Sequence, residues 1–131
     1  SLGDKARGDA LVRMALPSAL AEIAADPENG RALYLAAGMQ LRLGDVEGAR
    51  RSVETALRLQ PDDFGTLYNA ACTYTHMGEN ERALDLLERA LATGRGFRDW
   101  NEHGYGLDSL RGLPRYREIM ARLDLRKSEA V

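Results

Sequence analysis

Cys72 and His76 are the two residues of this sequence whose types and spacing best suit chemistry. They lie four positions apart, which places both on one face of a predicted helix. A thiolate and an imidazole could bind a metal ion, or act as a nucleophile and its base. A zinc site normally needs three or four protein ligands, however, and the other histidine, His103, lies in a distant predicted loop. A nucleophilic cysteine also needs a base held by a third group. We therefore interpret Cys72 as a small apolar residue beside a solvated histidine, and we expect no metal and no cofactor.

Other chemical motifs are incomplete. The Gly-Arg-Gly at 94–96 and the Gly-Tyr-Gly at 104–106 do not continue into a phosphate-binding Gly-Lys-Ser/Thr pattern or a dinucleotide fingerprint, so both are predicted to be turns. The carboxylates are scattered, and no two of them stand out as an acid/base pair. The only tryptophan, Trp100, is expected to anchor the last helix, with ligand contact as the alternative. The sequence therefore points away from an enzyme, and an enzyme fragment is the least favoured interpretation.

The composition is that of a folded helical domain. The 131 residues are 44% hydrophobic and 29% charged but only 6% aromatic, a balance that favours helices over sheets. A net charge of −2 gives no reason to expect nucleic acid as a partner. A single cysteine excludes an intrachain disulfide and favours a reducing, cytoplasmic setting. No apolar run approaches the roughly 20 residues that span a bilayer. The Ser-Leu start indicates a piece of a longer protein.

A 34-residue period organises the middle of the chain. Periods of this length are typical of stacked helical units that build binding surfaces. The recurring residues are Leu33, Ala37, Gly44, Ala49 and Ala56, which are matched 34 positions later by Leu67, Ala71, Gly78, Ala83 and Ala90. The small residues among them would let the two helices of each unit approach closely.

The boundaries of the helices can be predicted within each unit. Gly44 should end the first helix, because glycine adopts the left-handed conformation without a Cβ penalty. Asp45 is then placed to cap the next helix. Pro61 should end that helix, since proline disfavours a helical residue before it. Gly78 marks the same break in the second unit.

The two ends of the chain depart from this pattern. Apolar residues before residue 26 have helical spacing but are interrupted by Pro17, so we predict a short helix after Pro17, with room for another before it. Residues 1–29 are interpreted as a degenerate half-repeat. After residue 97 the period is lost, and Pro114 is predicted to open a last helix that covers the end of the stack. Its apolar face comprises Tyr116, Ile119, Met120 and Leu123.

The repeated unit resembles the tetratricopeptide repeat. The residues that carry the resemblance are Ala37, Gly44, Asp45, Ala49, Ala56 and Pro61 in the first copy, and Ala71, Tyr74, Gly78, Ala83 and Ala90 in the second. The resemblance implies an all-α fold, a TPR-type α-α superhelix of antiparallel helix hairpins with a C-terminal capping helix. It implies a single domain over residues 1–131, with the half-repeat at 1–29, repeats at 30–63 and 64–97, and a capping loop and helix at 98–131.

A narrower resemblance covers residues 68–123. They are similar to the repeat-bearing C-terminal regions of bacterial class III adenylate/guanylate cyclases and of related signalling proteins. This resemblance rests on the stretches 68–74, 96–100 and 114–116, among others. In those relatives acidic residues are expected after the histidine, where this chain has Gly104 and Gly106. The resemblance implies a regulatory segment of a larger bacterial signalling protein, and it includes none of the cyclase catalytic residues.

In tetratricopeptide repeats the first helix of each unit lines a concave groove. The corresponding positions are Arg31, Tyr34, Gly38, Leu41 and Arg42 in the first unit, and Tyr68, Asn69, Cys72, Thr75 and His76 in the second. Tyrosines such as Tyr34 and Tyr68 are common in binding hot spots. The resemblance therefore implies a non-catalytic module that binds a protein or peptide segment, or another domain of its parent. The alternative is self-association as a homodimer, because two repeats leave apolar end faces.

Overall fold

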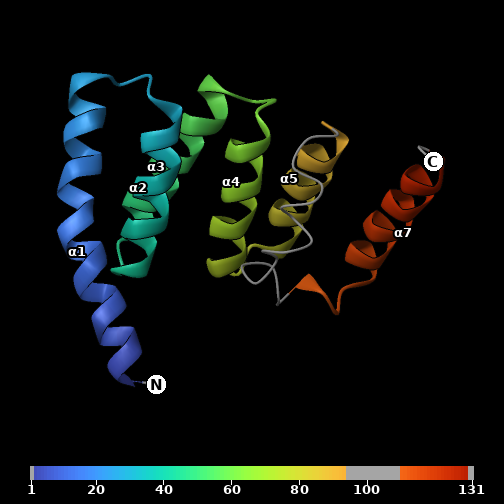
Figure 1. The fold of residues 1–131 in the computed structure, drawn as a ribbon, viewed down its shortest axis with the longest axis horizontal. Coiled ribbons are helices and arrows are strands. Elements are labelled where there is room, and N and C mark those ends of the chain that lie inside the picture. Colours follow the sequence, from blue (N-terminus) through green and yellow to red (C-terminus); the bar gives the residue numbers. More distant parts are fainter. Residues whose placement is uncertain (1, 94–109, 130–131) are drawn as a thin grey trace.

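The computed structural model describes residues 2–93 and 110–129 as an array of helices (Figure 1). This part of the chain contains no strand, and the predicted all-α fold is confirmed. The helices are α1 (Leu2–Ala25), α2 (Gly30–Arg42), α3 (Val46–Leu59), α4 (Phe64–His76), α5 (Asn80–Ala92) and α7 (Pro114–Glu129). Helices α2 and α3 form one antiparallel hairpin, and α4 and α5 form the next, so the chain folds into successive copies of one unit.

The predicted helix boundaries are confirmed at both hairpins. Gly44 and Gly78 adopt left-handed conformations, with φ of +91° and +82°, two residues after the ends of α2 and α4. The carboxylate of Asp45 accepts a hydrogen bond of 2.9 Å from the backbone N–H of Gly48 and so caps α3. Helix α3 ends at Leu59, two residues before Pro61. Local sequence signals therefore set the ends of α2, α3 and α4 and the start of α3.

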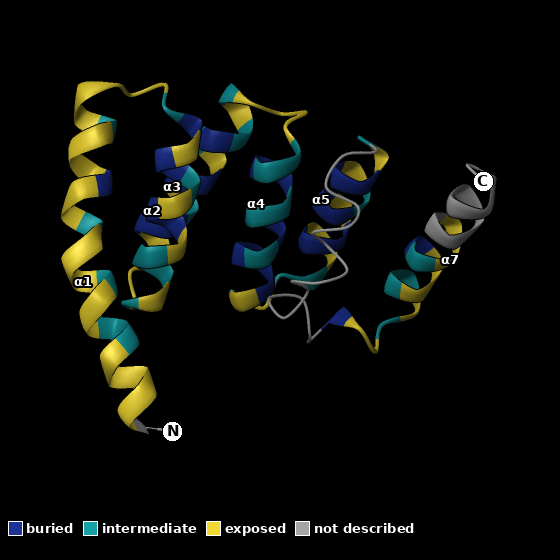
Figure 2. Ribbon diagram, in the orientation of Figure 1, coloured by how far each residue is buried: buried dark blue, intermediate teal, exposed yellow. Residues whose placement is uncertain are grey.

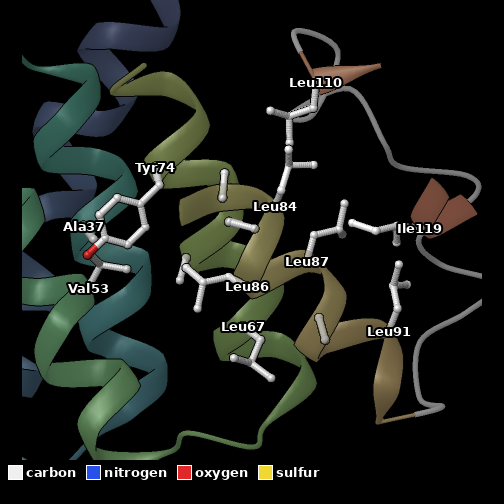
Figure 3. Close-up of a cluster of buried hydrophobic side chains, with 14 residues drawn as sticks. Ala37, Val53, Leu67, Tyr74, Leu84, Leu86, Leu87, Leu91, Leu110 and Ile119 are labelled. Atoms are coloured by element: carbon white, nitrogen blue, oxygen red, sulfur yellow. The ribbon is translucent and has the colours of Figure 1, made fainter. Parts of the chain in front are cut away.

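The core is richest around the second hairpin (Figure 3). Leu67, Tyr74, Leu84 and Leu87 are all almost completely removed from solvent. The alanines predicted to lie between paired helices, Ala37, Ala49, Ala71 and Ala83, have no exposed surface. The guanidinium of Arg82 lies 4.6 Å from the centre of the Tyr74 ring, an arrangement that favours a cation–π interaction.

Helix α7 packs on α5 and extends the core. Ile119 is only 3% exposed and belongs to the same apolar cluster as Leu84 and Leu87. Arg115 forms ion pairs with three carboxylates of α5, those of Glu81, Asp85 and Glu88. The expectation that a last helix covers the array is thus confirmed for the residues described. Several predictions concern residues or side chains that the structure does not describe. They are those for Trp100, His103, the glycine segments at 94–96 and 104–106, and the Leu123 side chain.

The period of the repeat continues further than the sequence suggested. Helices α3, α5 and α7 begin at Val46, Asn80 and Pro114, each 34 residues after the one before. The predicted loss of the period after residue 97 is therefore wrong for the start of this helix. Of the five recurring residues, the last segment keeps only the glycine, as Gly112, and the spacing of its helix.

Helix α1 corrects the prediction at the N-terminus. It runs without a break from Leu2 to Ala25 and contains Pro17 in its interior, so no helix begins at that proline. Proline costs a helix one backbone hydrogen bond, but packing along α2 through residues such as Leu16 and Ala19 holds the helix on both sides of it. The end at Ala25 lies 34 residues before the end of α3. Residues 12–25 therefore match α3 in register, and residues 2–11 are an extension.

Candidate functional site

A cleft of about 760 Å³ lies between α1, α2 and α4. One wall is the N-terminal half of α1, and the opposite wall is α4. The side chains along it mix apolar and charged groups. The lining residues are Lys5, Asp9 and Val12 from α1, Tyr34, Leu35, Gly38, Met39, Leu41 and Arg42 from α2, and Asn69, Cys72, Thr73 and His76 from α4.

Most of the predicted groove residues meet in this cleft. The residues brought together are Tyr34, Gly38, Leu41 and Arg42 of α2 and Asn69, Cys72 and His76 of α4. Residues three and four positions apart share one face of a helix, so the repeat pattern assigned these side chains to the same side of α2 and of α4.

Three predicted residues lie elsewhere. Thr75 is only 8% exposed, and its hydroxyl donates a 2.7 Å hydrogen bond to the carbonyl oxygen of Ala71, so it belongs to the packed interior. Tyr68 is half-buried and stacks on Phe64 with ring centres 5.7 Å apart. Arg31 is exposed at the start of α2 and does not line the cleft. Thr75, Tyr68 and Arg31 thus lie on the predicted helices but outside the lining of the cleft.

The α1 wall was missed by sequence reasoning. Asp9 is its central residue: it accepts hydrogen bonds from Lys5 at 2.8 Å and from Arg42 at 2.9 Å. The hydrogen bond from Lys5, followed by that from Arg42, lowers the pKa of Asp9 below its ordinary value, so the carboxylate is charged at neutral pH. Lys5, Asp9 and Val12 follow a helical spacing, but the resemblance assigns the groove to the first helix of each repeat and so leaves out this N-terminal wall.

Two glycines shape the cleft. A Cβ at Gly8 would collide with the guanidinium of Arg42, so a larger residue there would make this flexible side chain shift. At Gly38, by contrast, a Cβ would meet no atom within 4 Å. Gly38 therefore borders open space in the cleft and not a packed contact.

The α4 wall carries the pair that first suggested chemistry. Burial raises the pKa of the Cys72 thiol to about 11, so this group is neutral at physiological pH. His76 uses its Nδ1 to contact the backbone carbonyl oxygen of Cys72 at 2.7 Å and not the thiol. A carbonyl oxygen can only accept, so Nδ1 carries the hydrogen and Nε2 is left as an acceptor in the neutral ring. This arrangement does not activate the cysteine, because His76 contacts the backbone and a hydrogen bond with Tyr68 lowers the pKa of the thiol by less than burial raises it.

Asn69 is oriented by its own helix. Its Nδ2 donates a 2.8 Å hydrogen bond to the carbonyl oxygen of Gly65. The amide oxygen is the group that the side chain can offer to a backbone N–H in the cleft. Tyr34 reaches toward the same end of α4, since a Cβ at Gly65 would lie 3.5 Å from the Tyr34 hydroxyl oxygen.

The described residues hold no cluster of three or more His, Cys, Asp or Glu side chains that could bind a metal ion. Within the same residues, no helix has both the length and the apolar character needed to cross a membrane.

Comparison with known proteins agrees with the architecture. Residues 30–63 and residues 66–99 each match a family model described as a tetratricopeptide repeat, and together the matches cover just over half of the chain. The chain is also 36% identical over 52 residues to the protein named Protein CTR9 homolog from Arabidopsis thaliana. That alignment covers 40% of this chain and 5% of the length of the plant protein. With two adjacent repeats matched and folded as paired helices, this chain belongs to the tetratricopeptide repeat family.

Proposed function

We propose that this chain is a non-catalytic interaction module whose cleft between α1, α2 and α4 binds an extended segment of another protein or of another domain of its parent. Tetratricopeptide repeats support a role as a protein-interaction scaffold. The observation that carries the proposal is the cleft itself, since it gathers Tyr34, Leu41 and Cys72 with neighbouring polar groups on two successive repeats. Mostly apolar walls with a few placed polar groups are typical of recognition sites.

The charges of the cleft favour an acidic segment. Lys5 and Arg42 share the single carboxylate of Asp9, and their side chains are 69% and 46% exposed. The wall therefore carries more positive than negative charge, and Arg42 can exchange Asp9 for a carboxylate of the ligand. Apolar side chains of the segment would contact Val12, Leu35 and Leu41.

A substitution that fills the cleft tests this proposal. Gly38→Leu adds a side chain into open space at an exposed helical position, where leucine is a better helix former than glycine. We expect short peptides selected from a random display library on the wild-type chain to lose at least about tenfold in affinity for this variant. Tyr34→Ala should weaken the same peptides, because it removes a rigid contact surface.

Arg51→Leu is the matched control, since it places the same side chain on the exposed surface of α3, away from the cleft lining. It should bind the selected peptides like the wild type. Selected peptides that bind Gly38→Leu and Tyr34→Ala with unchanged affinity would refute the assignment of the cleft. Failure to select any peptide would count against segment binding as a whole.

We further propose that the module is a regulatory segment of a larger bacterial signalling protein, such as an adenylate cyclase. The support for this placement is the resemblance carried by residues 68–123. The complete reading frame tests it: a nucleotide cyclase or another signalling domain upstream would agree with the proposal, and a frame without one would refute it.

A further inference from the structure

Helix α1 has two different faces. Its inner face packs along α2 through residues that are buried or half-buried, namely Gly8, Val12, Leu16, Ala19 and Ile23. Its outer face is exposed (Figure 2) and follows a helical spacing through Arg7, Leu11, Met14, Ser18 and Glu22. Leu11 is 62% exposed and Met14 is 75% exposed, although side chains of this kind are usually covered. The outer face thus exposes a compact apolar centre on an edge of the molecule.

The charges at the ends of this stripe are complementary to each other. Arg7 lies on its N-terminal side and Glu22 on its C-terminal side, and the point midway between them falls beside Met14. Neither residue forms an ion pair within the described part of the chain. Two copies of the stripe placed antiparallel would therefore set Arg7 of each copy beside Glu22 of the other. A parallel arrangement would set like charges together.

We infer that the outer face of α1 binds a second copy of this chain in an antiparallel, two-fold symmetric pair. Leu11 and Met14 of the two copies meet at the centre, where the small residues Ala15 and Ser18 allow the helices to approach. The two Arg7–Glu22 pairs fix the direction and the register.

The position of α1 makes this association closed. Helix α1 lies at one end of the array and α7 at the other (Figure 1). A two-fold contact uses the same surface on both copies, so pairing through α1 consumes the surface and yields a dimer and not a filament. The cleft lies on the inner side of α1, so the dimer leaves two clefts available. This inference does not depend on what the cleft binds.

Sedimentation velocity of the 131-residue chain, up to a concentration of about 1 mM, measures the association directly. We expect a monomer–dimer equilibrium in the wild type and a monomer in Leu11→Asp/Met14→Asp. Circular dichroism of each variant checks that the fold is retained, as expected for changes at exposed positions. Val46→Asp, which changes another exposed apolar residue at the start of α3, is the matched control and should dimerise like the wild type.

Charge reversal tests the register. Arg7→Glu alone and Glu22→Arg alone should each weaken the dimer about tenfold or more, because each turns two attractions into two repulsions. An equimolar mixture of these two variants should form a heterodimer, since each copy then opposes the other with matching charges. A wild-type chain that stays monomeric throughout would overturn the inference. So would a dimer that is indifferent to the charge reversals or to Leu11→Asp/Met14→Asp.

Discussion

Burial determines the behaviour of Cys72 more than its histidine neighbour does. Burial raises the pKa of the thiol to about 11. A raised pKa means that little thiolate exists at pH 8, and that the thiolate fraction increases as the pH rises toward 11. We expect alkylation of the folded protein by iodoacetamide at pH 8 to be about 100-fold slower than that of a model thiol. The rate should increase with each added unit of pH.

The same measurement in urea provides the control, because the unfolded chain exposes Cys72 and should react at the rate of an ordinary thiol. Rapid alkylation of the folded protein at pH 8 would contradict the burial of this sulfur and would reopen the interpretation of Cys72 as a reactive group.

At the residue level, the sequence predicted the helix faces but not the depth of each side chain. Cys72 and Thr75 were assigned to the same surface, yet one lines the cleft and the other is buried behind it. Side chains three positions apart on a helix point in directions that differ by only about 60°. A small error in the orientation of α4 therefore moves a residue from the groove into the core. Orientation depends on tertiary packing, which a single sequence does not specify.

At the level of the elements, glycine at the helix ends is a conformational requirement, whereas glycine inside α2 is not. Gly44 has a φ of +91°, a region that L-residues adopt at a cost. Gly44→Ala should therefore destabilise the fold by about 1 kcal/mol. Gly38→Ala should stabilise it by about 0.5–1 kcal/mol, because alanine is the better helix former and a Cβ there meets open space. Urea denaturation of the two variants measures both changes, and equal signs would contradict this assignment.

The N-terminal helix shows what local signals cannot decide. Gly44, Asp45 and Pro61 mark helix boundaries as predicted, because the residues around them favour the same boundaries. Pro17 was expected to interrupt a helix, but α1 continues through it. The cost of one proline is about 3 kcal/mol, an amount that packing of the surrounding helix can offset. The cleft wall formed by Lys5 and Asp9 was missed because the resemblance places the groove on the first helices of the two repeats.

At the level of the whole molecule, apolar burial holds the last helix more strongly than its ion pairs do. Arg115 contacts three carboxylates, but these are 39–79% exposed, so the pairs together should contribute about 1 kcal/mol or less. Ile119 is 3% exposed and joins the core. Ile119→Ala should therefore cost about 2–4 kcal/mol in urea denaturation, and Arg115→Ala should cost less than half as much. The reverse order would show that α7 is held mainly by charge.

The unequal distribution of the core also bears on how the molecule moves. The fully buried large side chains gather around α4 and α5, while α1 contributes only Ala19 to the buried apolar residues of the described chain. Thin packing of this kind allows a segment to open locally while the rest stays folded. We therefore expect α1 to open more easily than the two hairpins. A ligand bound between α1 and the hairpins would order α1. The lost conformational entropy of α1 would then reduce the net free energy of binding.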